Sequence, residues 1–272
     1  MTCGKDNEFD AMKTIQQLFD LTGRVAIVTG GDGLLGFQMA WALAEAGAHV
    51  IVASLEGERC RQLASQLQAK YAPAMGIEFD QTRPDLVDGL IHATLDRFGR
   101  IDILVNNAAM NVPGSPVEEL SAAEWRRYFD TNVYGVFLCC HAVGEVMKAA
   151  GKGSIVNVAS IYGVVSPDHR IYGDTGMNSA LPYGAGKSAV IQMTRYLATY
   201  WASDGVRVNS LTPGGFYNHQ RDEFVANYCA RVPLGRMGKE TDLKGAIVFL
   251  AADASAYVTG HNLVVDGGLT VW

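Results

Sequence analysis

The chain has 272 residues, of which 49% are hydrophobic and 18% charged, and its formal net charge is −6. This composition excludes wholesale disorder and a fibrous architecture, and the acidic balance argues against nucleic acid as a partner, because phosphate binding needs a basic face. No uninterrupted apolar stretch reaches the roughly 18 residues of a membrane helix, so no membrane association is expected. The five cysteines are odd in number and lack C-x-x-C spacing. They predict neither disulfides nor a metal site and favour a cytoplasmic location.

Short apolar runs alternate with longer amphipathic stretches along the chain. They predict, in order, a strand over residues 25–29, a helix over 34–46, a strand over 49–53, a helix over 57–71, a strand over 76–79, a helix over 84–98, a strand over 101–105, a helix over 122–150, a strand over 154–159, a helix over 183–202, and strands over 206–211 and 263–265. Strands separated by helices pair in parallel, because each crossover helix returns the chain to the same edge of the sheet. We therefore predict an α/β fold, a Rossmann-like doubly wound parallel sheet of about seven strands with helices on both faces.

The turn after the first strand, Thr29-Gly-Gly-Asp-Gly-Leu-Leu-Gly36, is rich in glycine. Gly31, Gly33 and Gly36 satisfy G-x-G-x-x-G between a strand and a helix, the context in which this motif binds a dinucleotide. Glycine allows a pyrophosphate to approach the helix N-terminus, where free N–H groups and the helix dipole favour an anion. A purely structural turn would use the same residues, so the motif alone leaves both interpretations open.

The end of the second strand bears on the choice of cofactor. Ser54 stands where NAD enzymes place an acid that binds the ribose hydroxyls, and no Arg or Lys follows until Arg59. Ser54 can bond a hydroxyl or a phosphate, whereas Glu56 and Asp32 would repel a 2′-phosphate, which favours NAD over NADP. Glu56 as a solvated acid at a helix start is an equally good interpretation.

Four residues have the chemistry of a catalytic group. Tyr183 and Lys187 are spaced i,i+4 in a predicted helix, so both side chains lie on one face. An unperturbed Tyr titrates near ~10, and a nearby ammonium favours the phenolate that a general base requires. Ser160 follows the fifth strand at the edge of the sheet where ligands bind. Asn132 lies inside a predicted helix, where Asn is an indifferent helix former and serves either as a buried amide or as a relay.

In this order the motifs resemble the short-chain dehydrogenase/reductase family, over nearly the whole chain. The matching segments are the glycine turn, Asn106-Asn-Ala-Ala109, Asp80 after the third strand, and Pro213-Gly214 after the sixth. The resemblance is greatest to the sugar and sugar-acid dehydrogenases (gluconate 5-dehydrogenase-like), notably in Ser160-Ile-Tyr-Gly163 and Val265-Asp-Gly-Gly268. It implies one dinucleotide-binding catalytic domain over residues 1–272, with an N-terminal extension over 1–20 and an active-site insertion over 161–182.

The resemblance also implies hydride transfer between a nicotinamide and a carbinol or carbonyl carbon, without a metal. Tyr183 would be the general base and Ser160 would bind the substrate oxygen. Lys187 would lower the Tyr183 pKa and bind the nicotinamide ribose, while Asn132 would hold a water of a proton relay. NAD is the expected cofactor and NADP the alternative. The implied cofactor-binding residues are Gly30, Asp32, Gly33, Leu34, Leu35, Gly36, Ser54, Glu56, Asp80, Gln81, Asn107, Ala108, Tyr183, Lys187, Pro213 and Gly214.

Three positions depart from the family pattern. Leu34 replaces the second motif glycine, and Ala109 replaces the last residue of N-N-A-G. Ser160 and Tyr183 are 23 positions apart, farther than in the family, and the surplus is the polar insertion.

The insertion and the loop after the sixth strand are rich in hydrogen-bonding side chains, which predicts a small polar substrate: a sugar, a sugar acid or a polyol. Candidate contacts are His169, Arg170, Tyr217 and His219, and His169, Arg170 or Arg221 would meet a carboxylate. Ordinary solvent-exposed loops are the alternative interpretation.

Two alternative functions and an oligomeric state complete the predictions from the sequence. A 3-oxoacyl-thioester reductase would need a basic patch for an acidic carrier protein, which the net charge of −6 does not favour. A non-catalytic nucleotide-sensing regulator would not need a phenol beside an ammonium. The resemblance also implies a homotetramer formed through the helices at 122–150 and 183–202.

Overall fold

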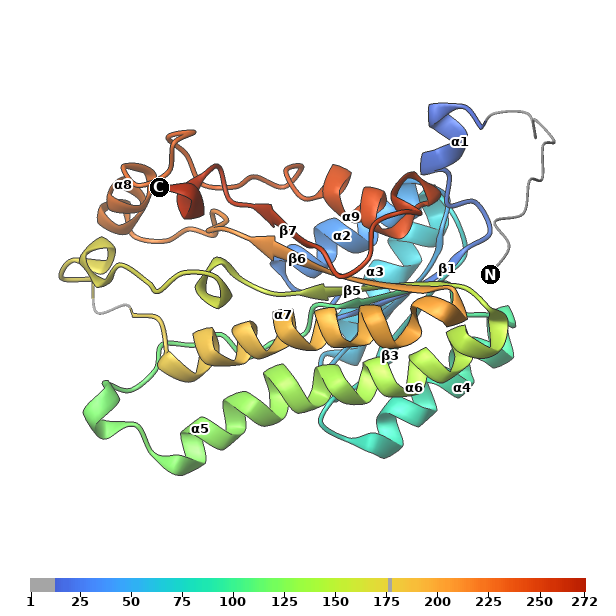
Figure 1. Ribbon diagram of the computed structural model, residues 1–272, viewed down its shortest axis with the longest axis horizontal. Helices are drawn as coiled ribbons and strands as arrows, with labels where there is room; N and C mark the ends of the chain where they lie inside the picture. The colour runs from blue at the N-terminus through green and yellow to red at the C-terminus, as the bar shows by residue number, and fades with distance from the viewer. Residues whose placement is uncertain (1–12, 176–177) are drawn as a thin grey trace.

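Short apolar runs form a single parallel sheet in the computed structural model, which describes residues 13–175 and 178–272 (Figure 1). Its strands are β1 Val25–Thr29, β2 His49–Ser54, β3 Ala74–Glu78, β4 Ile103–Asn106, β5 Gly153–Val158, β6 Val206–Pro213 and β7 Asn262–Val265. They pair in the order β3-β2-β1-β4-β5-β6-β7, each with its neighbour in parallel. The predicted fold class is confirmed.

Helices cover both faces of this sheet. Those in the described residues are α1 Ile15–Phe19, α2 Leu34–Glu45, α3 Gly57–Lys70, α4 Pro84–Phe98, α5 Ala122–Phe129, α6 Gly135–Ala150, α7 Leu181–Trp201, α8 Asp222–Cys229 and α9 Lys244–Ala251. Helices α2, α3 and α9 pack on one face, and α4, α6 and α7 pack on the other (Figure 1). Shorter 3-10 turns lie at Val117–Glu119, Ile161–Gly163, His169–Tyr172, Ala202–Asp204, Asp253–Ser255 and Leu269–Val271.

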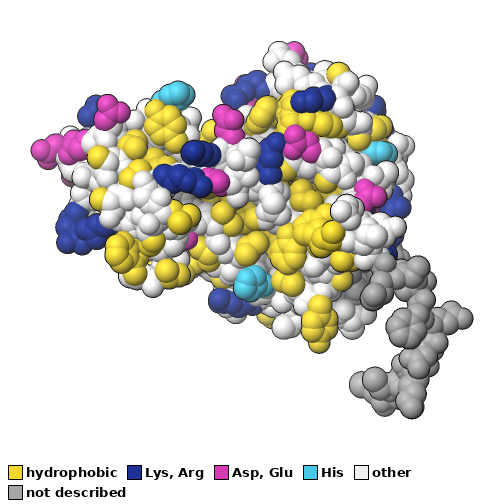
Figure 2. All heavy atoms as spheres, turned by 90° about the horizontal axis from the view of Figure 1, so that it is seen from above, with side chains coloured by type: hydrophobic (Ala, Val, Ile, Leu, Met, Phe, Trp, Pro, Cys, Tyr) yellow, Lys and Arg dark blue, Asp and Glu magenta, His cyan; other side chains and the backbone are white. Residues whose placement is uncertain are grey.

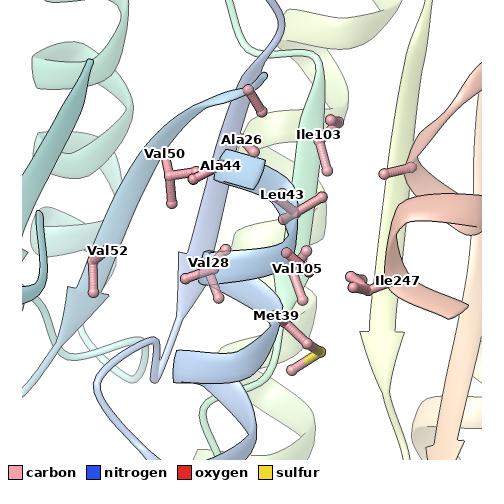
Figure 3. Close-up of a cluster of buried hydrophobic side chains, with 14 of the residues drawn as sticks. Ala26, Val28, Met39, Leu43, Ala44, Val50, Val52, Ile103, Val105 and Ile247 are labelled. Carbon is pink, nitrogen blue, oxygen red and sulfur yellow. The ribbon is translucent and has the colours of Figure 1, made fainter. Parts of the chain in front are cut away.

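Each central strand contributes to two hydrophobic cores, because successive side chains point to opposite faces. On β1, Val28 packs with Met39 and Leu43 of α2 in one core (Figure 3), whereas Ile27 packs in the core beneath α4, α6 and α7. Burial on both faces explains why the strands read as continuous apolar runs rather than as alternating patterns. Replacing a fully buried residue such as Leu43 by Ala is expected to cost about 2–5 kcal/mol of folding stability.

The helix predicted over residues 122–150 is interrupted. A π-helical turn, Asp130–Tyr134, separates α5 from α6 and has Asn132 at its middle. Such turns arise where the i→i+4 pattern slips, and they occur frequently at functional sites. Three further helices, α1, α8 and α9, were not predicted; each has at most eight residues, too few for a clear periodic pattern. Two strands also shift at their ends, since β3 begins two residues before its predicted start and β4 two residues after.

Within the described part of the chain, residues 122–150 form the one helical run long and apolar enough to span a bilayer, since it contains an 18-residue window with a mean hydropathy of 1.3. The inward side of this run, with Val136, Cys140 and Met147, packs against the sheet. That is the arrangement of a core helix. The predicted N-terminal extension is described only from Lys13, which together with Arg24 forms ion pairs with Asp253.

Candidate active site

A cleft of about 1540 Å³ opens at the carboxyl ends of the strands. The strand order turns back on itself between β1 and β4, and doubly wound sheets bind ligands at this switch point. Every residue predicted to bind the cofactor lines the cleft, as does Ser160; Asn132 does not.

The glycines of the turn divide into two groups. Gly30 has a φ of 59°, and an added Cβ would lie 2.8 Å from Ala108 Cα; a Cβ on Gly36 would lie only 2.0 Å from the Gly30 carbonyl oxygen. These two glycines are required by the fold itself. A Cβ on Gly33 would meet only the Gly30 carbonyl oxygen, at 3.4 Å, and would otherwise project into the cleft.

Gly33 precedes α2, whose first turn has no side-chain cap. The N–H groups of that turn are therefore available to an anion in the cleft. This cradle fits a dinucleotide pyrophosphate. Leu34, in place of the usual glycine, is the first residue of α2 and is exposed, so its side chain does not obstruct the turn.

Asn107 fixes the turn to the end of β4. Its Nδ2 donates to the carbonyl oxygens of Thr29 and Gly30, at 3.0 and 2.9 Å. The Thr29 hydroxyl accepts in return from the backbone N–H groups of Asn107 and Ala108, both at 3.1 Å. Asn107 thus acts by holding the phosphate turn in place.

The opposite end of the cleft is formed by the residues after β2 and β3. The Ser54 hydroxyl already has hydrogen-bond partners within the protein, since its Oγ lies 3.1 Å from Cys60 Sγ and accepts from the Glu56 N–H at 3.2 Å. Arg59 reaches back over the glycine turn, where it pairs with the Asp32 carboxylate at 3.4 Å and donates to the Asp32 carbonyl. The sequence could not show this pairing, because it depends on how α3 is oriented against the turn.

Asp80 and Gln81 follow β3 at the same end. Asp80 accepts from the N–H and hydroxyl of Thr82. Gln81 Nε2 donates to the carbonyl oxygens of Ala108 and Thr131, at 3.0 and 2.7 Å, while its buried Oε1 has no partner within the described structure. An orphaned acceptor in the lining of the cleft is a group that a bound nucleotide can satisfy.

Ser160, Tyr183 and Lys187 come together at the centre of the cleft. Ser160 lies two residues after β5 and caps the turn Ile161–Gly163, accepting from the Tyr162 N–H at 3.2 Å. Tyr183 lies in the first turn of α7, and Lys187 lies one turn later on the same face. Lys187 Nζ is 5.8 Å from the centroid of the Tyr183 ring and donates to the Val158 carbonyl oxygen at 2.6 Å.

Burial dominates the electrostatics of these groups. It lowers the pKa of Lys187 to about 8 and raises the pKa of Tyr183, while a hydrogen bond with Ser160 lowers the pKa of Tyr183. The expected lowering by Lys187 is thus not the main influence on Tyr183 in this geometry. With a pKa of about 8, Lys187 remains mostly an ammonium at pH 7, and its charge beside the ring favours the phenolate over the phenol.

Asn132 is fully buried in the π-helical turn between α5 and α6. Its Oδ1 accepts from the Met110 N–H at 2.7 Å, and its Nδ2 donates to the Met110 carbonyl at 2.9 Å. Its side chain therefore holds the loop after β4, and the water-binding role implied by the resemblance stays a prediction.

The insertion folds against the segment that follows β6. The rings of Tyr172 and Phe224 are stacked with centroids 5.6 Å apart, and Arg231 pairs with Asp168 at 2.7 Å. On the other side, Asn178 donates to the carbonyl of Gly114 and accepts from its N–H, at 2.6 and 2.9 Å. These contacts make the insertion one wall of the substrate end.

None of the four predicted substrate contacts lines this end. Arg170 is directed outward to Asp168, with which it pairs at 2.8 Å, and His169 is exposed. Tyr217 and His219 pack edge to face on each other, 5.4 Å apart, outside the lining. Local polarity identified the correct loops but could not show which side chains point inward.

The residues that do line the substrate end are mostly aromatic or amide. From the insertion and the segment after β6 they are Tyr162, Tyr172, Asn178, Ser179, Phe216, Asn218, Gln220, Phe224 and Tyr228. Residues 176 and 177 of the insertion lie outside the described residues. Phe224 and Tyr228 lie on α8, so a helix prediction with a face assigned to the cleft would have been needed to find them.

A glycine cradle at a helix N-terminus, joined by one cleft to a serine, a buried tyrosine and a buried lysine, defines a nicotinamide-dependent oxidoreductase of the doubly wound class. Within the described residues, no group of three or more His, Cys, Asp or Glu side chains is placed to hold a metal ion. Residues 33–270 match the sequence model of a family described as enoyl-(acyl carrier protein) reductase. The chain belongs to the short-chain dehydrogenase/reductase family and is an oxidoreductase acting on CH–OH groups.

Individual relatives agree with this assignment. The chain is 36% identical to a gluconate 5-dehydrogenase of Gluconobacter oxydans, over 93% of this chain and 97% of that protein. It is 35% identical to a D-threitol dehydrogenase of Mycolicibacterium smegmatis, over 93% and 95%. A crystal structure of a gluconate 5-dehydrogenase from Burkholderia cenocepacia, in complex with NADP and tartrate, superimposes with a TM-score of 0.87 at 33% identity, covering 95% of this chain and 100% of that one.

Proposed function

We propose that the protein interconverts a secondary alcohol and a ketone on a small polar substrate of the sugar, sugar-acid or polyol class. The observation that carries this proposal is the placement of Ser160, Tyr183 and Lys187 in the same cleft as the glycine cradle. The relatives named for gluconate and threitol support the substrate class.

In the oxidative direction the chain's own groups handle the proton. The Tyr183 phenolate accepts the substrate hydroxyl proton, and Ser160 donates a hydrogen bond to the substrate oxygen as its charge develops. The nicotinamide, when bound, accepts the carbinol hydrogen with its electron pair. Lys187 stabilises the phenolate by its charge, and burial of Tyr183 keeps this proton transfer away from bulk water.

For the cofactor we propose a preference for NAD. The Glu56 and Asp32 carboxylates line the adenosine end of the cleft, where they disfavour a 2′-phosphate. Arg59 is the countervailing cation, although it is paired with Asp32 and largely exposed. Titration with both nucleotides tests this, and Glu56→Gln is expected to improve NADP binding relative to NAD. Tighter binding of NADP by the wild-type protein would refute the preference.

We also propose a homotetramer and a cytoplasmic location. The stacked pairs Tyr134–Phe137 and Tyr196–Tyr200 are exposed at the outer side of α6 and α7. Exposed apolar surface of this kind is typical of an interface between subunits. The location rests on the composition alone.

The two rival functions find less support. Acidic and basic side chains are interspersed over the face that carries α8 and α9, without the basic patch that an acyl carrier protein would need (Figure 2). A regulator that only senses nucleotides would have no use for a tyrosine buried beside a lysine.

Replacing the proposed base tests the proposal directly. Tyr183→Phe is expected to lower kcat by about 10²- to 10⁴-fold while leaving nucleotide binding intact, because only the acidic hydroxyl is removed. The fully exposed Tyr257, changed to Phe, is the matched control. Activity is measured as NADH formation with a panel of polyols, sugars, sugar acids and hydrophobic alcohols. Turnover of the hydrophobic alcohols alone, or a Tyr183→Phe variant with wild-type kcat, would contradict the proposal.

A further inference from the structure

The charges along the cleft are unfavourable for a carboxylate. Among the described residues, the ionisable side chains of the lining, apart from the tyrosines, are the four acids Asp32, Glu56, Asp80 and Asp130 and the two cations Arg127 and Lys187. Lys187 is held by Val158 within the catalytic group. Arg127 lies on the exposed side of α5.

The side chains that the sequence offered for a carboxylate, His169, Arg170 and Arg221, do not line the cleft. Arg170 and Arg231 both pair with Asp168, at 2.8 and 2.7 Å. Arg221 precedes α8 as an exposed residue outside the lining. A carboxylate brought into this end of the cleft would lose its water without gaining a paired cation, which is unfavourable.

Neutral hydrogen-bonding groups, and not cations, are present at the substrate end of the cleft. Tyr162 and Tyr172 lie with their hydroxyl oxygens 3.1 Å apart, and Ser179 makes a further hydrogen bond to the Tyr172 hydroxyl. Burial raises the pKa of both phenols, so they stay uncharged at physiological pH and can both donate and accept. Stacking on Phe224 holds the Tyr172 ring in position.

From these observations we infer that the substrate end selects an uncharged polyol or ketose over a sugar acid, with Tyr172 and its partner Tyr162 as specificity-determining residues that bind substrate hydroxyls. The inference rests on the proposed function and narrows it to the neutral members of the class. The apolar walls formed by Phe216 and Phe224 contact the carbon chain, while the Asn218 amide provides a further neutral partner. The amides of Asn178 and Gln220 also line this end, but they are hydrogen-bonded to backbone groups of the neighbouring loops.

Pairs of substrates that differ only in charge test the inference. We would compare kcat/KM of the wild-type enzyme, with saturating NAD, for threitol against threonate and for galactitol against galactonate. The alditol is expected to be preferred at least 10-fold in each pair. Equal or greater kcat/KM for the acids would overturn the inference while leaving the proposed function standing. Absence of turnover with every alcohol tested would overturn both.

Two variants test which residues determine the preference for uncharged substrates. Tyr172→Phe keeps the stacked ring and removes one hydroxyl, so it should raise KM for the alditols about 10-fold with little change in kcat. Tyr257→Phe again serves as the matched control. Asn218→Arg introduces a cation into the lining and should raise kcat/KM for the acids at least 10-fold relative to the alditols. Unchanged KM in Tyr172→Phe, or unchanged selectivity in Asn218→Arg, would show that these residues do not face the substrate and would overturn the assignment.

Discussion

Lys187 is expected to destabilise the folded protein, and its removal gives a stability change that depends on pH. Burial lowers its pKa from 10.5 to about 8. Below pH 8 the ammonium is charged in both the folded and unfolded states, and the cost of burying it is fully present. Between pH 8 and 10.5 the folded protein has lost this proton while the unfolded chain still carries it. Folding stability from this group therefore rises with pH over that window.

The size of the effect follows from the same two values. Their difference corresponds to about 3 kcal/mol, gained at a slope of about 1.4 kcal/mol for each pH unit. Lys187→Met removes the titrating group but also leaves the Val158 carbonyl without its donor, a loss of about 1–3 kcal/mol that does not depend on pH. At pH 7 the change in the free energy of unfolding is thus a small difference between the relief of burying the charge and the loss of the hydrogen bond. Only the first of these depends on pH, so the slope with pH reports the buried charge.

Urea denaturation of both proteins from pH 7 to pH 10, without cofactor, measures this slope, since titrating groups distant from Lys187 cancel in the difference. Between pH 7 and pH 10, the free energy of unfolding of the wild type relative to that of Lys187→Met should rise by most of about 3 kcal/mol. Lys152→Met, at an exposed lysine, is the matched control for the loss of one charge. A wild-type-minus-variant difference that stays flat across this range would show that Lys187 is not buried as an ammonium, and the reasoning would be wrong.

Three further variants test the positions of individual side chains. Gly36→Ala places a Cβ 2.0 Å from the Gly30 carbonyl oxygen and should lower the melting temperature, whereas Gly33→Ala should keep it and weaken NAD binding, measured by calorimetry. Equal effects of the two substitutions on melting temperature and on NAD binding would contradict the assignment of Gly36 to the fold and of Gly33 to the cofactor site. Asn132→Ala removes two buried hydrogen bonds to Met110 and should cost about 2–4 kcal/mol in urea denaturation; a neutral result would refute its role in holding the loop. Arg59→Ala should weaken NADP binding more than NAD binding, and the reverse would show that Arg59 does not reach the ribose.

The catalytic arrangement could be predicted because it depends on regular elements. Parallel strands end at one edge of the sheet, so Ser160 after β5 and the glycine turn after β1 must lie near one another once the sheet is inferred. The spacing of Tyr183 and Lys187 then fixes both on one face of α7. The break around Asn132 could not be predicted, because the residues 122–150 keep an apolar, helix-forming pattern through it.

The doubly wound sheet and the positions of the proposed nucleotide-binding and catalytic residues could be read from the sequence, since period and spacing are local properties that backbone geometry converts directly into position. Only the tertiary structure decided the substrate end. The direction of Tyr172 depends on its stacking with Phe224, and that of Arg170 on its pairing with an Asp168 that Arg231 also binds. Side chains in loops have no repeating geometry to orient them, so contacts between distant segments settle which of them face the substrate.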